Sequence, residues 1–372
     1  MNITFLIGNG FDIGIGLKTR YEDFYKEYCV VKDRDSDNIK NFKKVLSERN
    51  KSNEKRIIDW ADFEKAFGEY SSEFTAEEKG LYIECFEDFI LCFNSYLEKE
   101  EKMVDYSSKD EIGKKMKEAV TTYFHIRAED RDELQKIYDK YPSKRQYNFI
   151  SFNYTKTIDK CVDILREHIK NEVERTTGSV AHIHGYIDAN MIIGVNDASQ
   201  ITNPDFANDE DVISEIVKPQ QNKEGRTGYE NKTISLINKS QIICVYGMSI
   251  GETDKKWWDI ISKWLRGNKD RRLVILKYDD KCDVRFIYTQ RRATNNAINK
   301  FLSLSDLTEK EKDIIKGQIY VGVNYNVFSI NLRKQEKKQE QSLFKTITPY
   351  SISSPIITSE DVLNNDYLLY TK

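Results

Sequence analysis

An apolar run that breaks on two glycines opens the chain and constrains its fold more than any other feature. Residues 3–7 read Ile-Thr-Phe-Leu-Ile, and Gly8-Asn9-Gly10 follows directly, before a helix-like stretch. A buried strand that turns through Gly-x-Gly into a helix exposes backbone N–H groups where the helix N-terminus adds positive potential, which favours a phosphate. The pattern therefore predicts a nucleotide-binding loop at the edge of a parallel sheet.

This loop departs from the dinucleotide fingerprint Gly-x-Gly-x-x-Gly. Ile13 stands at the third glycine position, and Gly14 comes one residue late. An ordinary dinucleotide-binding unit also places an acidic residue about 20 residues further on, at the end of a second strand. No strand with such an end follows here. We therefore expect a nucleotide loop of another kind, with the choice between NAD and NADP left open.

Charge and composition limit the class of protein. The 372 residues carry a formal net charge of −3, whereas general nucleic-acid binders show a basic excess. No apolar run reaches the roughly 18 residues of a membrane helix, and the first residues lack a secretion signal. Six scattered cysteines without a Cys-x-x-Cys pair favour reduced thiols in the core. We expect a cytoplasmic protein that binds neither membrane nor nucleic acid.

Short strands that alternate with helices predict an α/β fold with a parallel sheet and helices on both faces. After the first strand, further strands are predicted at 147–152, 180–183, 191–195, 241–246 and 273–278. Residues 60–141 instead carry aromatic residues at three- and four-residue steps, which predicts a helical insertion or cap. The assignments are a core at 1–59 and 142–333, a mobile loop or lid at 196–231 and a peripheral tail at 334–372.

Polar residues follow several of the predicted strands. Because the carboxyl ends of parallel strands meet at one edge of the sheet, ligands bind there. The residues concerned are Gly8-Asn9-Gly10, Asn153-Tyr154-Thr155, His184-Gly185 and Gly247-Met248-Ser249. We expect these four strand ends to meet around one ligand.

Two of the four histidines, His182 and His184, stand two residues apart, so in a strand they would face the same side. They could form a metal pair, but no further ligand motif accompanies them, and we predict no metal. His182 is expected to be packed and hydrogen-bonded. His184 precedes a glycine at a strand end, where an imidazole can face a cleft and act as a general base.

Other polar residues have a structural and a functional interpretation. The Asn153 amide can bind a ribose hydroxyl or a water, or it can close a local turn. Ser249 is a helix N-cap by default, although the same position can offer its hydroxyl to a phosphate. Glu64, with Asp62, is expected to cap or solvate a helix, and a site role is the less favoured alternative. No Walker loop or Gly-x-Ser-x-Gly elbow occurs.

Taken in order, these motifs resemble the sirtuin-type NAD-binding core. More closely, the chain resembles the bacteriophage abortive-infection AbiH family from residue 1 to about 330. The motifs that carry this resemblance are Leu6-Ile-Gly-Asn-Gly-Phe-Asp12, Trp60-Ala-Asp-Phe-Glu64, Ser151-Phe-Asn-Tyr-Thr155, His182-Ile-His-Gly185 and Tyr246-Gly-Met-Ser-Ile250 with Asp254.

The resemblance implies a sirtuin-like fold and an NAD+ hydrolase that depletes NAD+ in the infected cell. Asn153 would hold the ribose or the attacking water, and His184 would be the general base. The predicted cofactor-binding residues are Gly8, Asn9, Gly10 and Phe11 around the pyrophosphate, Asp12 at a ribose hydroxyl, Gly247 and Ser249 at the distal phosphate or adenosine, with Thr155 and Gly185 completing the motifs.

Departures from the sirtuin pattern favour water as the acceptor. Thr155 stands where deacetylases have an aspartate, and the four-cysteine zinc module is absent. The expected partners are NAD+ and either further copies of the chain or a phage-sensing protein from the same operon. Two other functions stay open: a non-catalytic nucleotide sensor or scaffold, and a metal-dependent nuclease that uses His182 and His184 with Asp12 or Asp197.

Overall fold

The fold is that of a computed structural model, which describes residues 1–51, 60–122, 126–142, 144–187, 189–225, 228–328 and 330–334. Residues Met1–Lys334 form one compact unit. Apart from Lys334, the predicted tail at 334–372 lies outside the described residues. The domain boundaries proposed at residues 59 and 141 stay predictions.

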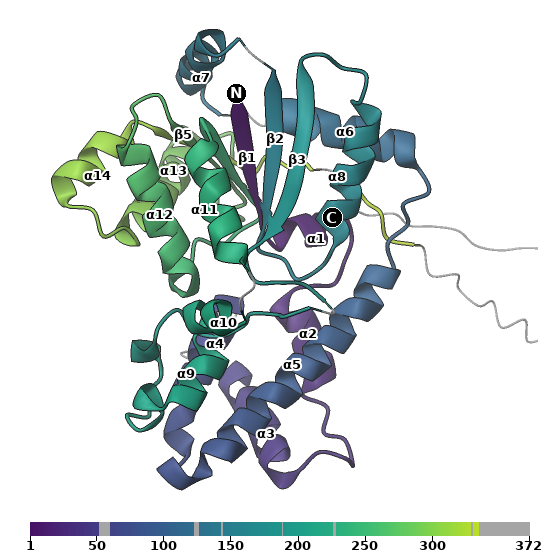
Figure 1. The fold of residues 1–372 in the computed structure, drawn as a ribbon, viewed down its shortest axis with the longest axis vertical. Coiled ribbons are helices and arrows are strands. Elements are labelled where there is room, and N and C mark those ends of the chain that lie inside the picture. Colours follow the sequence, from purple (N-terminus) through teal and green to yellow (C-terminus); the bar gives the residue numbers. More distant parts are fainter. Residues whose placement is uncertain are drawn as a thin grey trace, which may run out of the picture. The chain divides into compact units, whose positions relative to one another are not determined.

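Six parallel strands form the central sheet, in the order β3-β2-β1-β4-β5-β6 (Figure 1). Every residue of β4 is buried, as expected for a parallel strand that is covered on both faces. The sheet confirms the predicted α/β class, whereas its sirtuin-like form stays a prediction. The strands are β1 (Asn2–Ile7), β2 (Arg145–Ser151), β3 (Arg175–His182), β4 (Ile242–Tyr246), β5 (Arg272–Lys277) and β6 (Ile319–Val323).

The strand order changes direction beside β1. The chain adds β2 and β3 on one side of β1 and then returns to place β4, β5 and β6 on the other. In sheets with such a reversal, ligands bind beyond the carboxyl ends of the strands at the point where the order reverses, which here lies between β1 and β4.

Helices cover both faces of the sheet, because side chains alternate along each strand. Phe5 and Ile7 belong to one hydrophobic cluster, whereas Leu6 belongs to the other. The first face carries α1 (Gly10–Gly14), α6 (Lys109–Thr121), α7 (Ala128–Lys140) and α8 (Thr157–His168). The second face carries α11 (Tyr229–Lys239), α12 (Lys255–Arg266), α13 (Ile287–Ser303) and α14 (Glu309–Lys316).

A third cluster forms a helical layer beyond the carboxyl ends of the strands (Figure 1). Aromatic rings fill it: Phe63 stacks on Phe89 with ring centroids 4.0 Å apart. In this layer, α4 contacts the short turn η5 (Glu252–Asp254) that follows β4. The helices of the layer are α2 (Tyr21–Tyr28), α3 (Asp37–Lys51), α4 (Trp60–Tyr70), α5 (Lys79–Lys102), α9 (Glu210–Ile216) and α10 (Lys218–Glu224).

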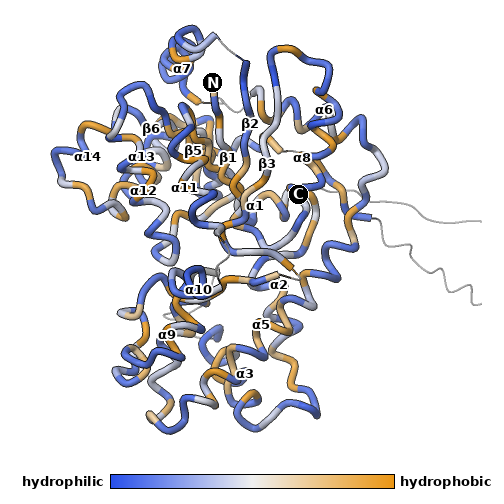
Figure 2. The backbone as a smooth tube through the Cα atoms, in the orientation of Figure 1, coloured by the Kyte–Doolittle hydropathy of each residue, from blue (hydrophilic) through white to orange (hydrophobic). Residues whose placement is uncertain are grey.

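Helices were expected throughout residues 60–141, and α4 to α7 occupy this range. They divide between two places, since α4 and α5 lie in the helical layer and α6 and α7 pack on the sheet. In Figure 2 much of the sheet is hydrophobic, whereas the outer helices α7 and α14 carry long hydrophilic stretches. All six cysteines are free thiols, and four of them are buried.

Two predictions about the middle of the chain are wrong. Residues 191–195 form no strand, because only Val195 makes an isolated bridge, to Val217. Residues 196–231 are not one long loop: their described part holds α9, α10, the start of α11 and two short turns, η3 (Ala198–Gln200) and η4 (Phe206–Asn208). Buried apolar residues such as Ile216 hold this segment in the helical layer. Strand β6 was not predicted.

Candidate active site

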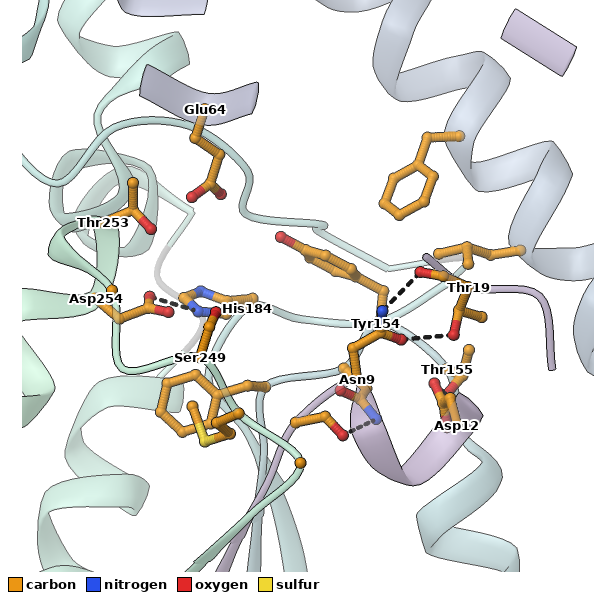
Figure 3. Close-up of a pocket in the computed structure, with 18 of the residues that line it drawn as sticks. Asn9, Asp12, Thr19, Glu64, Tyr154, Thr155, His184, Ser249, Thr253 and Asp254 are labelled. Carbon is orange, nitrogen blue, oxygen red and sulfur yellow. Dashed lines mark hydrogen bonds and ion pairs between the residues drawn. The ribbon is translucent and has the colours of Figure 1, made fainter. Parts of the chain in front are cut away.

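A cavity of about 120 Å³ lies beyond the carboxyl ends of the strands, where the helical layer covers them. Side chains from α4, α5 and α10 line it together with the loops that follow β1, β2, β3 and β4. Eight of the eleven predicted site residues line this cavity: Gly8, Asn9, Asp12, Asn153, Thr155, His184, Gly247 and Ser249. The sequence therefore located the strand ends that meet, as Figure 3 shows.

The glycines of the loop after β1 allow it to pack closely against the loop after β4. A Cβ atom at Gly10 would lie 2.5 Å from the Gly247 Cα, and one at Gly8 would lie 2.7 Å from the Gly247 carbonyl oxygen. Gly247 itself has a φ of +68°, which favours glycine. The loops after β1 and β4 thus pack backbone against backbone, and Met248 and Asn9 line the cavity beside the glycines.

Most of the backbone donors in this loop already have acceptors. The N–H groups of Gly8, Gly10 and Phe11 donate to carbonyl oxygens of Tyr246, Gly247 and Gly8, at 2.9, 2.8 and 2.9 Å. The helix that follows, α1, has only 5 residues, so its dipole is short. A phosphate at this loop would find few of the donors that the glycine pattern suggests.

The side chain of Asn9 is also engaged within the protein. Its Nδ2 donates to the Thr19 carbonyl oxygen at 2.7 Å, and its Oδ1 accepts from the Thr19 hydroxyl at 2.5 Å (Figure 3). Asn9 therefore ties the glycine loop to the segment that leads into α2. Phe11 is fully buried against Phe328, and neither Phe11 nor Gly10 lines the cavity.

Asp12 is a buried carboxyl group at one end of the cavity. It accepts hydrogen bonds from the hydroxyls of Thr155, at 2.7 Å, and Thr157, at 2.5 Å. Burial raises the pKa of Asp12 to about 6, although the two threonine hydrogen bonds oppose the rise. A carboxyl group with this pKa exchanges a proton near neutral pH, so Asp12 can orient a ribose hydroxyl in either protonation state.

The raised pKa of Asp12 predicts a pH-dependent effect of Asp12→Asn. The folded protein holds the proton more tightly than the unfolded chain, so Asp12 contributes stability that is complete below about pH 4 and is lost as the pH rises through about 6. Between pH 4.5 and 7.5, Asp12→Asn should gain about 2 kcal/mol of stability relative to wild type. Thermal unfolding of both proteins at pH 4.5 and 7.5 measures this gain. An equal difference in melting temperature at both pH values contradicts the prediction.

Asn153 lies beside the glycine loop. Its Nδ2 donates to the Gly8 carbonyl oxygen at 3.1 Å, and its backbone N–H donates to the Ser151 hydroxyl at 3.1 Å. The residue is 5% exposed and lines the cavity. Its amide is thus fixed between the strand ends of β1 and β2, where it can contact a sugar or a water in the cavity.

His184 carries an unsatisfied ring nitrogen. Its Nε2 lies 3.1 Å from Asp254 Oδ1, whereas its buried Nδ1 has no hydrogen-bond partner among the described residues (Figure 3). A buried polar atom without a hydrogen-bond partner costs free energy of folding, and in an active site such an atom is a candidate to bind a ligand. A carboxylate at Nε2 places the proton there, so Nδ1 keeps the lone pair of a general base.

Two further charged side chains continue this arrangement into the helical layer. Lys218 of α10 lies 3.4 Å from Asp254 Oδ1 and 2.8 Å from the Glu64 carboxylate of α4. Burial alone would raise the pKa of Asp254, but attraction to Lys218 and the hydrogen bond with His184 outweigh it and hold the pKa below its ordinary value. Burial raises the pKa of Glu64 in spite of Lys218. We call Glu64, Lys218, Asp254 and His184 the ionic chain.

Residues 4–276, well over half of the chain, match the family described as Bacteriophage abortive infection AbiH. The chain belongs to the AbiH family. A role in abortive infection by phage follows from this membership. A comparison with curated proteins found no match.

The remaining predicted residues of this AbiH protein lie close to the cavity without lining it, or differ in local role. His182 behaves as expected: its Nε2 lies 2.8 Å from Asp159 Oδ2, and its ring packs on Tyr186. Gly185 has a φ of +68° and forms the turn after β3. Ser249 is not a helix N-cap, because α12 begins only at Lys255, and its exposed hydroxyl faces the cavity.

Sequence reasoning missed Lys218 and assigned Glu64 a capping role. Lys218 lies in a polar segment that resembled a loop, and one lysine among many gives no signal of burial. The apolar residues Val212 and Ile216 lie four positions apart, which is typical of one buried helix face, and Val217 follows directly; this spacing would have indicated a packed segment. Among the described residues, no three His, Cys, Asp or Glu side chains are placed to hold a metal ion, and no helix could span a membrane.

Proposed function

We propose that this AbiH protein hydrolyses NAD+ at the nicotinamide–ribose bond and acts as an effector of abortive infection. One observation carries the proposal: His184, whose buried Nδ1 has no partner among the described residues and whose Nε2 lies 3.1 Å from Asp254, lines a cavity at the strand ends together with Asn153. A base oriented in this way can activate a water or a ribose hydroxyl.

The topology of the sheet supports a dinucleotide as the substrate. The order 3-2-1-4-5-6 is that of doubly wound sheets, which bind dinucleotides in the crevice where the strand order reverses. The cavity lies beyond this point of the sheet, and the loops after β1 and β4 both line it. Gly8 and Gly247 carry no side chain, so a sugar or its phosphate can approach the backbone at these two positions.

The proposed reaction begins with departure of nicotinamide from C1′ of the ribose, whose ring oxygen takes up the positive charge. Asn153 orients the ribose or the water, and His184 removes a proton from the water as its oxygen bonds to C1′. The products are nicotinamide and ADP-ribose. The covered cavity excludes bulk water, so that the one held water reacts.

The size of the cavity sets a condition on binding. Its volume of about 120 Å³ is below the roughly 300–1,000 Å³ of pockets that enclose a drug-sized ligand. It can therefore enclose only part of a dinucleotide, and we place the nicotinamide riboside there. Binding of the adenosine half requires α5 and α10, which cover the cavity, to move outward.

Incubation with NAD+ tests the proposal. Nicotinamide and ADP-ribose should appear in equal amounts, from the protein alone or together with the proteins of neighbouring genes, and chromatography measures both. Asn153→Ala should lower the rate about 10²–10³-fold, since it removes an orienting dipole from the site. Asn208→Ala, at an exposed position of the helical layer, is the matched control. Absence of nicotinamide under every condition overturns the proposal.

A non-catalytic nucleotide sensor is the second candidate, and the occupied donors of the glycine loop favour contacts to a part of the nucleotide other than its pyrophosphate. With the N–H groups of Gly8, Gly10 and Phe11 already bonded, the loop has little left to grip a pyrophosphate. Such a site would hold NAD+ or a fragment of it without turnover. The sensor then shows a rise in melting temperature with NAD+ and no product over hours.

A further inference from the structure

The ionic chain crosses from the helical layer to the strand ends. Glu64 and Lys218 stand on α4 and α10, whereas Asp254 and His184 belong to the turns after β4 and β3. Lys218 is 6% exposed, and its ammonium also donates to the Thr253 carbonyl oxygen at 3.4 Å. A buried lysine with three oxygen acceptors is thus the link between the two parts of the site.

We propose that Lys218 is a positioning residue for His184: through Asp254, its ammonium keeps the imidazole neutral, with the proton on Nε2 and the lone pair of Nδ1 in the cavity. Lys218 belongs to the helical layer, so the placement of that layer over the strand ends sets the strength of the base. The inference rests on the proposed function in taking His184 as the base.

The charges of the ionic chain explain how the Lys218 ammonium affects the protonation of His184. Asp254 Oδ1 is the hydrogen-bond partner of both Lys218 Nζ, at 3.4 Å, and His184 Nε2, at 3.1 Å. While the carboxylate is neutralised by the ammonium, it attracts a second proton on the imidazole only weakly. Burial alone would lower the pKa of Lys218, but attraction to Asp254 and Glu64 outweighs it, so the ammonium keeps its charge.

Removal of the ammonium leaves Asp254 and His184 as an isolated buried pair. A carboxylate at hydrogen-bond distance then stabilises the imidazolium, because an opposite charge nearby favours the charged form of an ionisable group. His184 would take up a proton on Nδ1 and lose the lone pair that faces the cavity. The base would fail at neutral pH although every residue that contacts the substrate is still present.

Other charged groups near His184 act less directly. Tyr154, whose ring centroid lies 6.2 Å from that of His184, stays neutral because burial raises its pKa well above the ordinary value. Across a small neighbouring cavity, Glu230 and Lys256 pair at 2.6 Å and offset each other. Asp12 lines the same main cavity as His184 and is held by two threonines. Glu64 acts on His184 both through Lys218 and by direct attraction between its carboxylate and an imidazolium.

Titration of the imidazoles by ¹⁵N NMR tests this inference without substrate. The chain has only 4 histidines, so their signals can be assigned by substitution. In wild type, His184 should show the neutral Nε2–H form at pH 7.5. Lys218→Met should raise the pKa of His184 by about one unit or more, and Lys218→Arg should restore it at least in part. Glu64→Gln should lower it slightly, because the remaining ammonium then acts on Asp254 alone.

Lys79→Met is the matched control. Lys79 pairs with Asp209 and Asp211 within the helical layer, away from the cavity, so its loss should leave the titration of His184 unchanged. An unchanged pKa of His184 in Lys218→Met overturns the inference. If Lys218→Met does not fold, Lys218→Gln takes its place: a raised pKa of His184 supports the inference, and an unchanged one overturns it.

Nicotinamide release separates this inference from the proposed function. If wild type hydrolyses NAD+, the acid limb of its pH–rate profile should move to higher pH in Lys218→Met, by as much as the NMR titration moves. If wild type never hydrolyses NAD+, the proposed function fails. The tautomer and titration of His184 still decide whether Lys218 controls the imidazole.

Discussion

Substitution of His184 by alanine is expected to lower NAD+ hydrolysis about 10²–10⁴-fold, the usual contribution of a positioned general base. The variant loses the Nδ1 lone pair in the cavity while Asp254 keeps its ion pair with Lys218. The fold should survive, because the ring occupies a cavity wall and the sheet clusters do not include it. Nicotinamide release, measured at saturating NAD+, gives the rate.

Two further variants make this result specific. His184→Gln keeps a polar side chain at the position but has no titrating nitrogen, so it should be as inactive as the alanine variant. His168→Ala removes an exposed histidine at the end of α8 and should keep wild-type activity. Hydrolysis at the wild-type rate in His184→Ala would show that another group is the base.

The largest effect on stability is expected at Lys43, which lies outside the candidate site. Its ammonium forms a buried ion pair with Asp35 at 2.7 Å, in which the side chains are 1% and 3% exposed. The same ammonium lies 4.9 Å from the centre of the Tyr28 ring. Lys43→Met would leave a carboxylate buried without its partner, which costs about 3–5 kcal/mol. Urea unfolding followed by circular dichroism measures the loss.

The chain offers a matched control for Lys43 on the same helix. Lys40 pairs with Asp37 at 3.1 Å, but both side chains are exposed to solvent. Lys40→Met should therefore change the unfolding midpoint little, since exposed pairs contribute little. In Lys43→Met/Asp35→Asn, the unpaired charge is gone, and part of the lost stability should return. Equal midpoints for the two lysine variants would mean that the buried pair is not important for stability.

The strand ends were predictable because local signals mark them. An apolar run followed by glycine or by a polar residue describes a buried strand and its turn, and such runs correctly located β1, β2, β4 and β5. Parallel pairing then brings their carboxyl ends to one edge whatever the order of the strands. Asn153 and His184 therefore line one cavity, as expected from two short motifs.

Other features of the site depend on contacts that the sequence does not display. Asn9 forms two hydrogen bonds with Thr19, since the fold brings the loop before α2 against it. Lys218 is buried only because Glu64 and Asp254, 154 and 36 positions away, provide acceptors. Residues 196–231 are polar on average, yet a few apolar side chains such as Val212 anchor them. Pairings over such separations follow from the three-dimensional packing.

The residues that line the cavity lie far apart in the sequence, and this determines how much of the chain must be synthesised before the site can form. Gly8 is made among the first residues, whereas Asp254 comes 246 positions later, and both line the same cavity. The turn after β4 must therefore have left the ribosome before the cavity can form. No nascent fragment that stops short of this turn contains the complete pocket.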